Sequence, residues 1–183
     1  MPLDLSPLKK KHPGEAEGRI AKPVLVEYLY LDLQVCDRCI GTEQVLEEVL
    51  SKLSPVLQLA GYTLDYRETK MDTPELARQY QFVSSPTIRV NGRDICFMVQ
   101  ENPCDCCSDI SGSIVDCRIY NYEGRGYEVP PQEMLAEAIL KAVFGSQNAP
   151  CCGENEYKLP KNLEVFYDGK NNKSGCDCVS SCC

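Results

Sequence analysis

Cysteine is the residue type in this sequence with the greatest capacity for chemistry. There are 13 cysteines among the 183 residues, and they fall into three groups. The groups lie in the motif CDRC at residues 36–39, within residues 96–117, and within residues 151–183. Thiolates are nucleophiles in disulfide exchange and ligands for soft metal ions. The sequence therefore predicts redox or metal chemistry that depends on sulfur.

The CDRC motif has the spacing of a redox-active dithiol. We expect it at the start of a helix, where backbone N–H groups and the helix dipole stabilise a thiolate. Cys36 is then the expected nucleophile, and Cys39, one helical turn away, can resolve a mixed disulfide. Arg38 would favour the thiolate, whereas Asp37 would oppose it. An inert disulfide and metal capture by the same two sulfurs are alternatives that the motif leaves open.

The other cysteines predict a site for a thiophilic ion. Because His12 is the one histidine, any metal site must be dominated by sulfur. The residues do not select among Hg, As, Cu and Zn, and they imply no cofactor with certainty. The predicted metal-binding thiols are Cys104, Cys106, Cys107, Cys151, Cys152, Cys176, Cys178, Cys182 and Cys183.

The first three of these thiols lie in the segment NPCDCC, which we expect to be a loop that wraps an ion. Cooperation between this loop and the CDRC dithiol is a hypothesis. Cys96 and Cys117, which flank the loop, are expected to pack on strands as small apolar residues. Adjacent cysteines in the C-terminal segment seldom bond to each other, so we expect them to bind ions or to exchange electrons with the dithiol.

Charge and hydropathy restrict the class of protein. A net charge of −8 without a basic stripe argues against nucleic acids and anionic membranes as partners. The longest apolar stretch, residues 24–33, is interrupted by Glu27 and Asp32 and is too short to span a bilayer. The N-terminal residues lack the apolar region of a secretory signal. We expect a cytoplasmic protein whose partner is a protein thiol or disulfide, or a soft metal ion; its oligomeric state is not predicted.

Hydrophobic periodicity predicts alternating strands and helices in the middle of the chain. Alternating and apolar runs indicate strands, and apolar residues at helical spacing indicate amphipathic helices. The turn residues Asn91 and Gly92 indicate a hairpin. In chain order, we expect a strand at 24–31, a helix after residue 39, a strand at 62–67, a helix at 75–80, a hairpin at 87–95, a strand at 115–122 and a helix from 130 to 145.

These elements suggest one domain with two extensions. Residues 1–22 are expected to form a flexible arm and residues 23–145 the domain, with a cysteine-rich insertion at 96–113. Residues 146–183 are expected to form a cysteine-rich tail. Within the tail, the apolar group at 163–167 is expected to dock on the domain as a short helix.

The segment from about residue 24 to 145 resembles the thioredoxin superfamily. Two motifs carry the resemblance: CDRC at a strand-to-helix junction, and SSPTIRVNGRDI after a short helix. The resemblance implies an α/β fold with a central mixed sheet of four or five strands flanked by helices. It also implies a cis bond before Pro86, with Pro86 shaping the partner groove beside the dithiol, and thiol-disulfide exchange as the activity.

The sequence departs from thioredoxin in having no tryptophan and no Gly-Pro pair between the first two cysteines. Through NGRDI, CRIY and PPQEML it is similar to an uncharacterised bacterial and archaeal thioredoxin-like group with extra cysteines, some linked to mercury or arsenic handling. A heavy-metal-associated domain is the competing fold. The function we expect is thiol-disulfide exchange through Cys36 and Cys39, with relay through other cysteines. The alternative is a protein that binds, sequesters or delivers a soft metal or metalloid ion. Whether the protein is an enzyme is left open.

Overall fold

The computed structural model describes residues 20–96, 98–145 and 156–174. It is an α/β fold with two sheets and five helices in these residues. The larger sheet has the strand order β2-β1-β3-β4, in which β1 is parallel to β2 and antiparallel to β3. Its strands are β1 (Lys22–Tyr30), β2 (Tyr62–Lys70), β3 (Thr87–Val90) and β4 (Arg93–Asp94).

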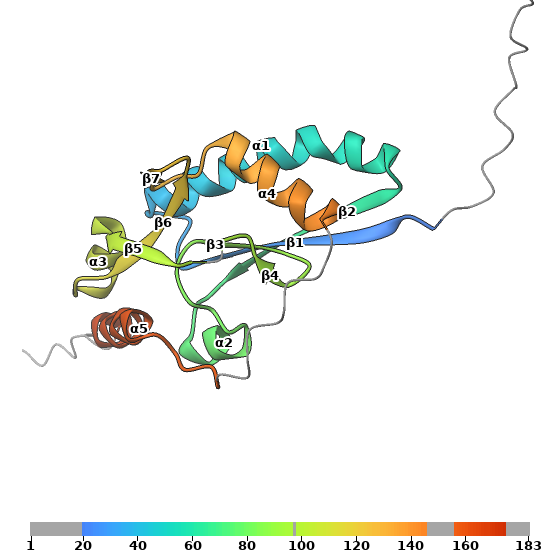
Figure 1. Cartoon of the computed structure of the whole chain (residues 1–183). Helices are drawn as coiled ribbons and strands as arrows, with labels where there is room; N and C mark the ends of the chain where they lie inside the picture. The colour runs from blue at the N-terminus through green and yellow to red at the C-terminus, as the bar shows by residue number, and fades with distance from the viewer. Residues whose placement is uncertain (1–19, 97, 146–155, 175–183) are drawn as a thin grey trace, which may run out of the picture.

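Helices cover both faces of the larger sheet. Figure 1 shows α1 (Asp37–Leu59) and α4 (Gln132–Phe144) together on one face, with α2 (Pro74–Gln79) on the other. The helical spacing of the apolar residues explains this packing, because one side of α1 buries Leu46 and Val49 against the sheet. No helix among the described residues has the length and apolar character needed to cross a membrane.

The hairpin between β3 and β4 confirms the expectation from the turn residues. Asn91 has φ 51° and Gly92 has φ 76°, so both central residues adopt the left-handed conformation of a two-residue hairpin turn. Asn91 also accepts a hydrogen bond from the Leu25 amide, through Oδ1 at 3.0 Å, and this bond ties the turn to β1.

The expected insertion, residues 96–113, contains the first strand of a second sheet. This sheet has the order β5-β6-β7, with the bounds β5 (Gln100–Pro103), β6 (Asp116–Tyr122) and β7 (Arg125–Tyr127). The strand expected at 115–122 therefore belongs to a separate antiparallel sheet and does not extend the central one. The expectation missed β5 because Gln-Glu-Asn-Pro is short and polar, with no alternation of apolar residues.

Arg118 on β6 fastens the second sheet to the first. Its side chain is 1% exposed and forms an ion pair with Asp94 on β4, with 2.7 Å between Nη2 and Oδ2. Nη2 also donates to Thr87 Oγ1 at 2.9 Å. A buried guanidinium is stable only when it is paired in this way, so the ion pair determines how the two sheets dock.

The segment before β3 forms the second link between the sheets. The Ser85–Pro86 bond is cis, as the resemblance implied. The Ser85 carbonyl accepts a hydrogen bond from the Arg118 amide at 2.7 Å, and the Pro86 carbonyl accepts one from the Tyr120 hydroxyl at 3.0 Å. Residues 85 and 86 therefore contact β6 directly.

The final helix, α5 (Lys161–Ser174), packs against α3 (Asp105–Ser111), as Figure 1 shows. The expected docking of the apolar group at 163–167 is confirmed, since Leu163, Phe166 and Tyr167 are buried. The two helices approach closely at Gly169, where a Cβ would lie 2.2 Å from the Ser111 carbonyl oxygen. Glycine is therefore required at this crossing.

We predict that Asp94→Ala lowers the free energy of unfolding by about 3 kcal/mol, because it leaves the buried Arg118 charge unpaired. Urea unfolding measures this loss. The matched control is Asp65→Ala, which removes an exposed ion pair with Arg67 and should cost less than about 1 kcal/mol. Equal small losses in both variants would contradict the role of Arg118.

Candidate functional site

Two helices begin beside the same group of sulfur atoms. Cys36 is the N-cap residue of α1, and Cys104 is the N-cap residue of α3. Neither cysteine caps its helix with a side-chain hydrogen bond, so both sulfurs are available for other contacts. The unpaired N–H groups of a helix N-terminus favour negative charge. The fold thus provides two such ends for thiolates.

Three sulfurs form a compact buried group. The Sγ atoms of Cys36, Cys104 and Cys107 all lie within 4.8 Å of one another, and no other group of three potential ligands with this spacing occurs in the part of the chain that the structure describes. The three residues are at most 2% exposed, and their thiols are free. Cys36 Sγ and Cys107 Sγ are 3.9 Å apart. This spacing allows one atom to contact all three sulfurs.

Cys117 extends the cluster from the side of β6. Its Sγ lies 3.3 Å from Cys107 Sγ, and the residue is fully buried. Cys117 is not a member of the group of three mutually close sulfurs. Its burial on a strand confirms the expectation for this residue, whereas Cys96 lies beyond β4 and not on a strand.

Cys39 contacts the segment before β3. Its Sγ lies 3.4 Å from Ser85 Oγ, which also accepts a hydrogen bond from the Leu31 amide at 3.1 Å. The Cys39 carbonyl accepts a 2.6 Å hydrogen bond from the Tyr28 hydroxyl. The two cysteines of CDRC are therefore both buried and free, and they contact different partners.

The expected ion-binding loop at CDCC is a helix. Cys104 and Cys107 have the same C-x-x-C spacing as Cys36 and Cys39, and each pair begins a helix. This repeated spacing is visible in the sequence and indicates a second dithiol, which the expectation of a loop overlooked. Cys106 is partly exposed and lies outside the group of three sulfurs. The hypothesis that this segment reaches Cys36 is confirmed by the distances.

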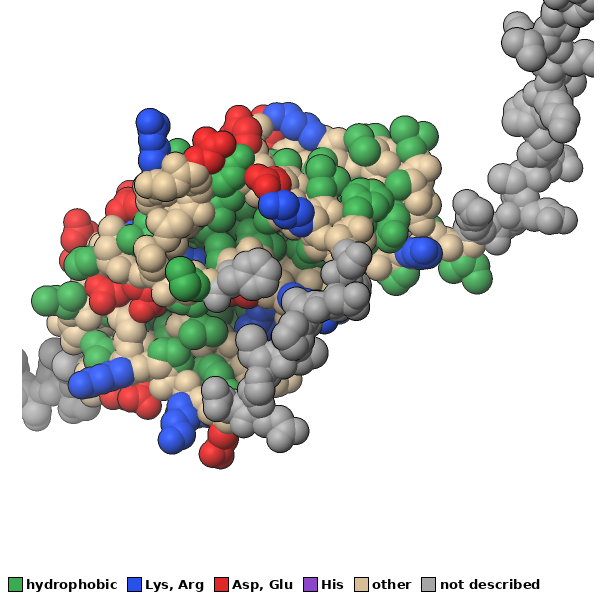
Figure 2. Space-filling view, viewed as in Figure 1, with side chains coloured by type: hydrophobic (Ala, Val, Ile, Leu, Met, Phe, Trp, Pro, Cys, Tyr) green, Lys and Arg blue, Asp and Glu red, His purple; other side chains and the backbone are tan. Residues whose placement is uncertain are grey.

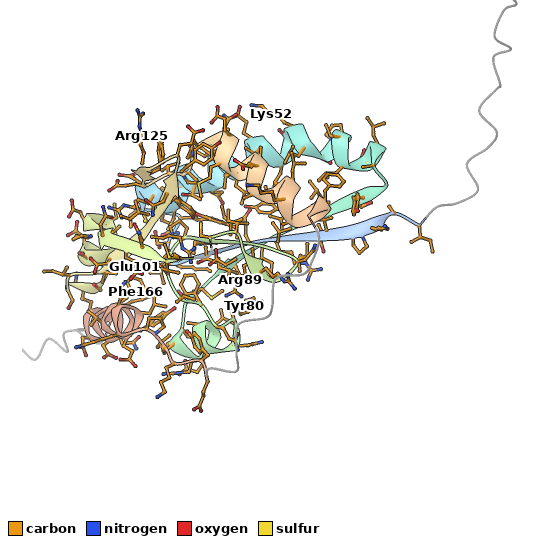
Figure 3. The ribbon with its side chains drawn as sticks, in the orientation of Figure 1. Lys52, Tyr80, Arg89, Glu101, Arg125 and Phe166 are labelled. Atoms are coloured by element: carbon orange, nitrogen blue, oxygen red, sulfur yellow. The ribbon has the colours of Figure 1, made fainter. Side chains whose placement is uncertain are left out.

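The surroundings of the cluster are apolar. Leu31, Met71 and Phe82 pack in the same buried core as the cysteines. From α5, Leu163 and Phe166 join this core, and Figure 3 labels Phe166 on the side of α5 that faces α3 and β5. Carboxylates and imidazoles are missing from the group of three ligands within the described residues. A soft ion bound there would meet sulfur and little water.

Arg38, between the two cysteines of CDRC, joins α1 to the second sheet. Its guanidinium donates to the Pro103 carbonyl at 2.7 Å and to the Asn102 side chain. It also forms an ion pair with Glu128 at 2.6 Å, and its side chain is 10% exposed. The expected effect of Arg38 on the thiolate is therefore partly offset, because Glu128 and the carbonyls engage its charge.

Hydrogen bonds within the cluster divide the thiols into two kinds. Hydrogen bonds from three neighbouring thiols hold the pKa of Cys36 far below its usual range; the largest effect comes from Cys104, followed by Cys107 and Cys117. The same kind of bond, first from Cys107 and then from Cys117, lowers the pKa of Cys104 to about 7. Donation to Cys104 raises the pKa of Cys107. Cys36 and Cys104 therefore lose their protons more readily than Cys107.

Pro86 lies in the segment that contacts Cys39 through the neighbouring Ser85, so the structure places it beside the first dithiol. The remaining predicted ligands lie outside the described residues. These are Cys151, Cys152, Cys176, Cys178, Cys182 and Cys183.

On the face shown in Figure 2, acidic and basic side chains are interspersed.

A family model described as a domain of unknown function (DUF2703) matches residues 24–139. The matched range contains both C-x-x-C motifs and Cys117, and it ends before α5. The comparisons with curated proteins and with solved structures found no match.

The lowered pKa of Cys104 predicts that this thiol titrates near neutral pH. In reduced protein, the ultraviolet absorbance should increase by the amount expected for one thiolate as the pH rises through about 7, because Cys104 releases its proton there. The absorbance should decrease by the same amount when the pH is lowered again. Cys104→Ser should abolish this step. Cys96→Ser is the control and should retain the step, because burial raises the pKa of Cys96. A step that persists in Cys104→Ser would contradict the assignment.

Proposed function

The chain belongs to the DUF2703 family, and we propose that this member binds one soft metal or metalloid ion through the thiolates of Cys36, Cys104 and Cys107. The observation that carries the proposal is the mutual approach of these three buried sulfurs to within 4.8 Å. They are supplied by the first turns of two helices, so the backbone fixes their positions.

The sulfur distances support coordination to one ion. With metal–sulfur bonds of about 2.3 Å, two ligand sulfurs lie about 3.8 Å apart in tetrahedral geometry and about 4.0 Å apart in trigonal geometry. The 3.9 Å between Cys36 Sγ and Cys107 Sγ falls between these values. The set needs little rearrangement to close around an ion.

The protonation states favour the same proposal. A metal-binding cysteine must lose its proton, and binding therefore weakens as pH falls. Cys36 and Cys104 already have lowered pKa values, so only Cys107 must give up a proton at and above neutral pH. Sulfur-only ligation in an apolar core selects thiophilic ions over Mg²⁺ and Ca²⁺, which prefer oxygen ligands.

Thiol-disulfide exchange is the second proposed activity. The strand order β2-β1-β3-β4, with a C-x-x-C motif at the start of α1, is similar to the core of the thioredoxin fold and supports a thioredoxin-like assignment. Pro86, before β3, is in the position that the resemblance implies. Cys36 is 0% exposed, however, and attack on a protein disulfide requires access to its sulfur. Because the Cys36 sulfur is buried, we rank ion binding above thiol-disulfide exchange.

We predict that the reduced protein binds one Cd²⁺, used as a probe, and that Cys36→Ser, Cys104→Ser and Cys107→Ser each weaken binding by at least about 100-fold. Loss of an outer-shell partner alone costs roughly 10- to 100-fold, and a lost ligand should cost more. Anaerobic titration with elemental analysis measures affinity and stoichiometry. The parent for these variants is the full chain with serine at positions 151, 152, 176, 178, 182 and 183, here named the tail-serine protein.

The tail-serine protein keeps α5. Truncation at position 149 would remove this helix and its buried residues. Cys96→Ser and Cys106→Ser are the matched controls, because both cysteines lie outside the group of three, and they should leave Cd²⁺ affinity within about threefold. Equal losses in the controls and in the three ligand variants would refute the site.

For the second activity, we predict slow reduction of insulin, within about twofold of the rate with reductant alone, because the Cys36 sulfur is buried. The assay follows insulin turbidity with the tail-serine protein and its Cys36→Ser variant. Rapid turnover that Cys36→Ser abolishes would reverse the ranking and make exchange the main activity.

A further inference from the structure

The Cys107 sulfur lies near two other sulfurs, those of Cys36 and Cys117. The inference drawn from this arrangement rests on the proposed ion site. We propose that Cys107 ligates the ion in the reduced protein and forms a disulfide with Cys117 on oxidation, so that the site holds its ion only under reducing conditions. The ion site and the disulfide share one sulfur and exclude each other.

The distances favour Cys117 as the oxidation partner. Cys107 Sγ lies 3.3 Å from Cys117 Sγ and 3.9 Å from Cys36 Sγ. A disulfide bond is about 2.05 Å long, so the two closer sulfurs need to move by little more than about 1 Å. Cys117 stands outside the three-sulfur group, so in the reduced state it is a neighbour of the ion site and not one of its ligands.

A rigid frame keeps the two sulfurs adjacent. The Cys104 amide donates to the Val115 carbonyl at 2.9 Å, next to the start of both α3 and β6. Ser108 Oγ donates to the Cys104 carbonyl at 2.7 Å and accepts from the Val115 amide at 3.0 Å. These bonds hold the start of α3 against the start of β6 and so keep the sulfurs of Cys107 and Cys117 near each other.

The oxidation is a two-step exchange with a small-molecule disulfide, because the fully buried Cys107 sulfur is out of reach of a protein disulfide. Cys107, already deprotonated as a ligand of the ion, attacks one sulfur of that disulfide; the sulfur–sulfur bond breaks, and the leaving thiolate takes up a proton from water. Cys117 then loses its proton and attacks Cys107 Sγ in the mixed disulfide, which expels the second thiol. Two electrons pass from the two cysteines to the small disulfide, which leaves as two thiols.

Disulfide formation removes one ligand of three. A disulfide sulfur lacks the negative charge that metal binding requires. Cys36 and Cys104 are left as the remaining thiolates, and the ion is released. Reduction by a dithiol reverses both steps and restores the site.

The test loads the tail-serine protein with one Cd²⁺ and adds hydroxyethyl disulfide under anaerobic conditions. We expect bound Cd²⁺ to fall from one per chain to less than about one tenth. Elemental analysis after desalting measures the ion. Cleavage before aspartate then separates the peptide 105–108 from the peptide that begins at Asp116, and mass spectrometry should find them linked by a disulfide.

Cys106→Ser in the same background makes Cys107 the one cysteine of peptide 105–108, so the linkage is assigned without ambiguity. Cys117→Ser is loaded to one Cd²⁺ per chain in the same way and should keep the ion in the presence of the oxidant. Cys117→Ala is tested beside it, because a buried serine hydroxyl can destabilise the fold. Cys96→Ser is the matched control and should release the ion as the parent does.

Release of Cd²⁺ from folded Cys117→Ser or Cys117→Ala, or a linkage between other cysteines, would overturn the inference. Failure of Cd²⁺ to bind the reduced parent would instead overturn the proposed function, and mapping the ion-free protein would still show whether Cys107 and Cys117 pair. The two failures are therefore distinguishable.

Discussion

The hydrogen bonds of the Arg38 guanidinium hold the first turn of α1 against the second sheet. Arg38 donates to Pro103, the residue before Cys104, and pairs with Glu128 before α4. The clustered thiols come from separate parts of the chain, namely α1, α3 and β6. They meet only because these parts dock, and a buried charge whose partners are lost is strongly destabilising. Arg38 thus positions the second dithiol, Cys104 and Cys107, and also links the CDRC dithiol to the second sheet.

This docking changes the chemistry of the first dithiol. An isolated C-x-x-C motif at a helix start is suited to exchange with external disulfides, because its first sulfur is accessible. Here Cys36 is buried in a core that includes residues of α3 and α5, and its sulfur lies within 4.8 Å of the sulfurs of Cys104 and Cys107. Thiolates enclosed by thiols and apolar groups are suited to holding a soft ion. If the cluster binds an ion as we propose, oxidation of the same sulfurs would compete with binding.

Local sequence patterns predicted the larger sheet and its helices, because strand alternation, helical periodicity and the Asn91-Gly92 turn are short-range signals. They also placed Cys36 at a helix start. The second sheet was missed, since β5 is four polar-rich residues and α3 has seven residues, lengths at which periodicity says little. The meeting of Cys36 with Cys104 depends on long-range hydrogen bonds of Arg38 and Arg118, which no local pattern encodes.

We propose that three cysteine sulfurs from two helix N-termini bind one ion. X-ray absorption spectroscopy of the tail-serine protein loaded with one equivalent of arsenite measures the ligands of the arsenic directly. We expect a single shell of three sulfur atoms, which Cys107→Ser reduces to two sulfurs and an oxygen. Oxygen ligands in the parent protein, or a three-sulfur shell that survives in Cys107→Ser, would contradict it.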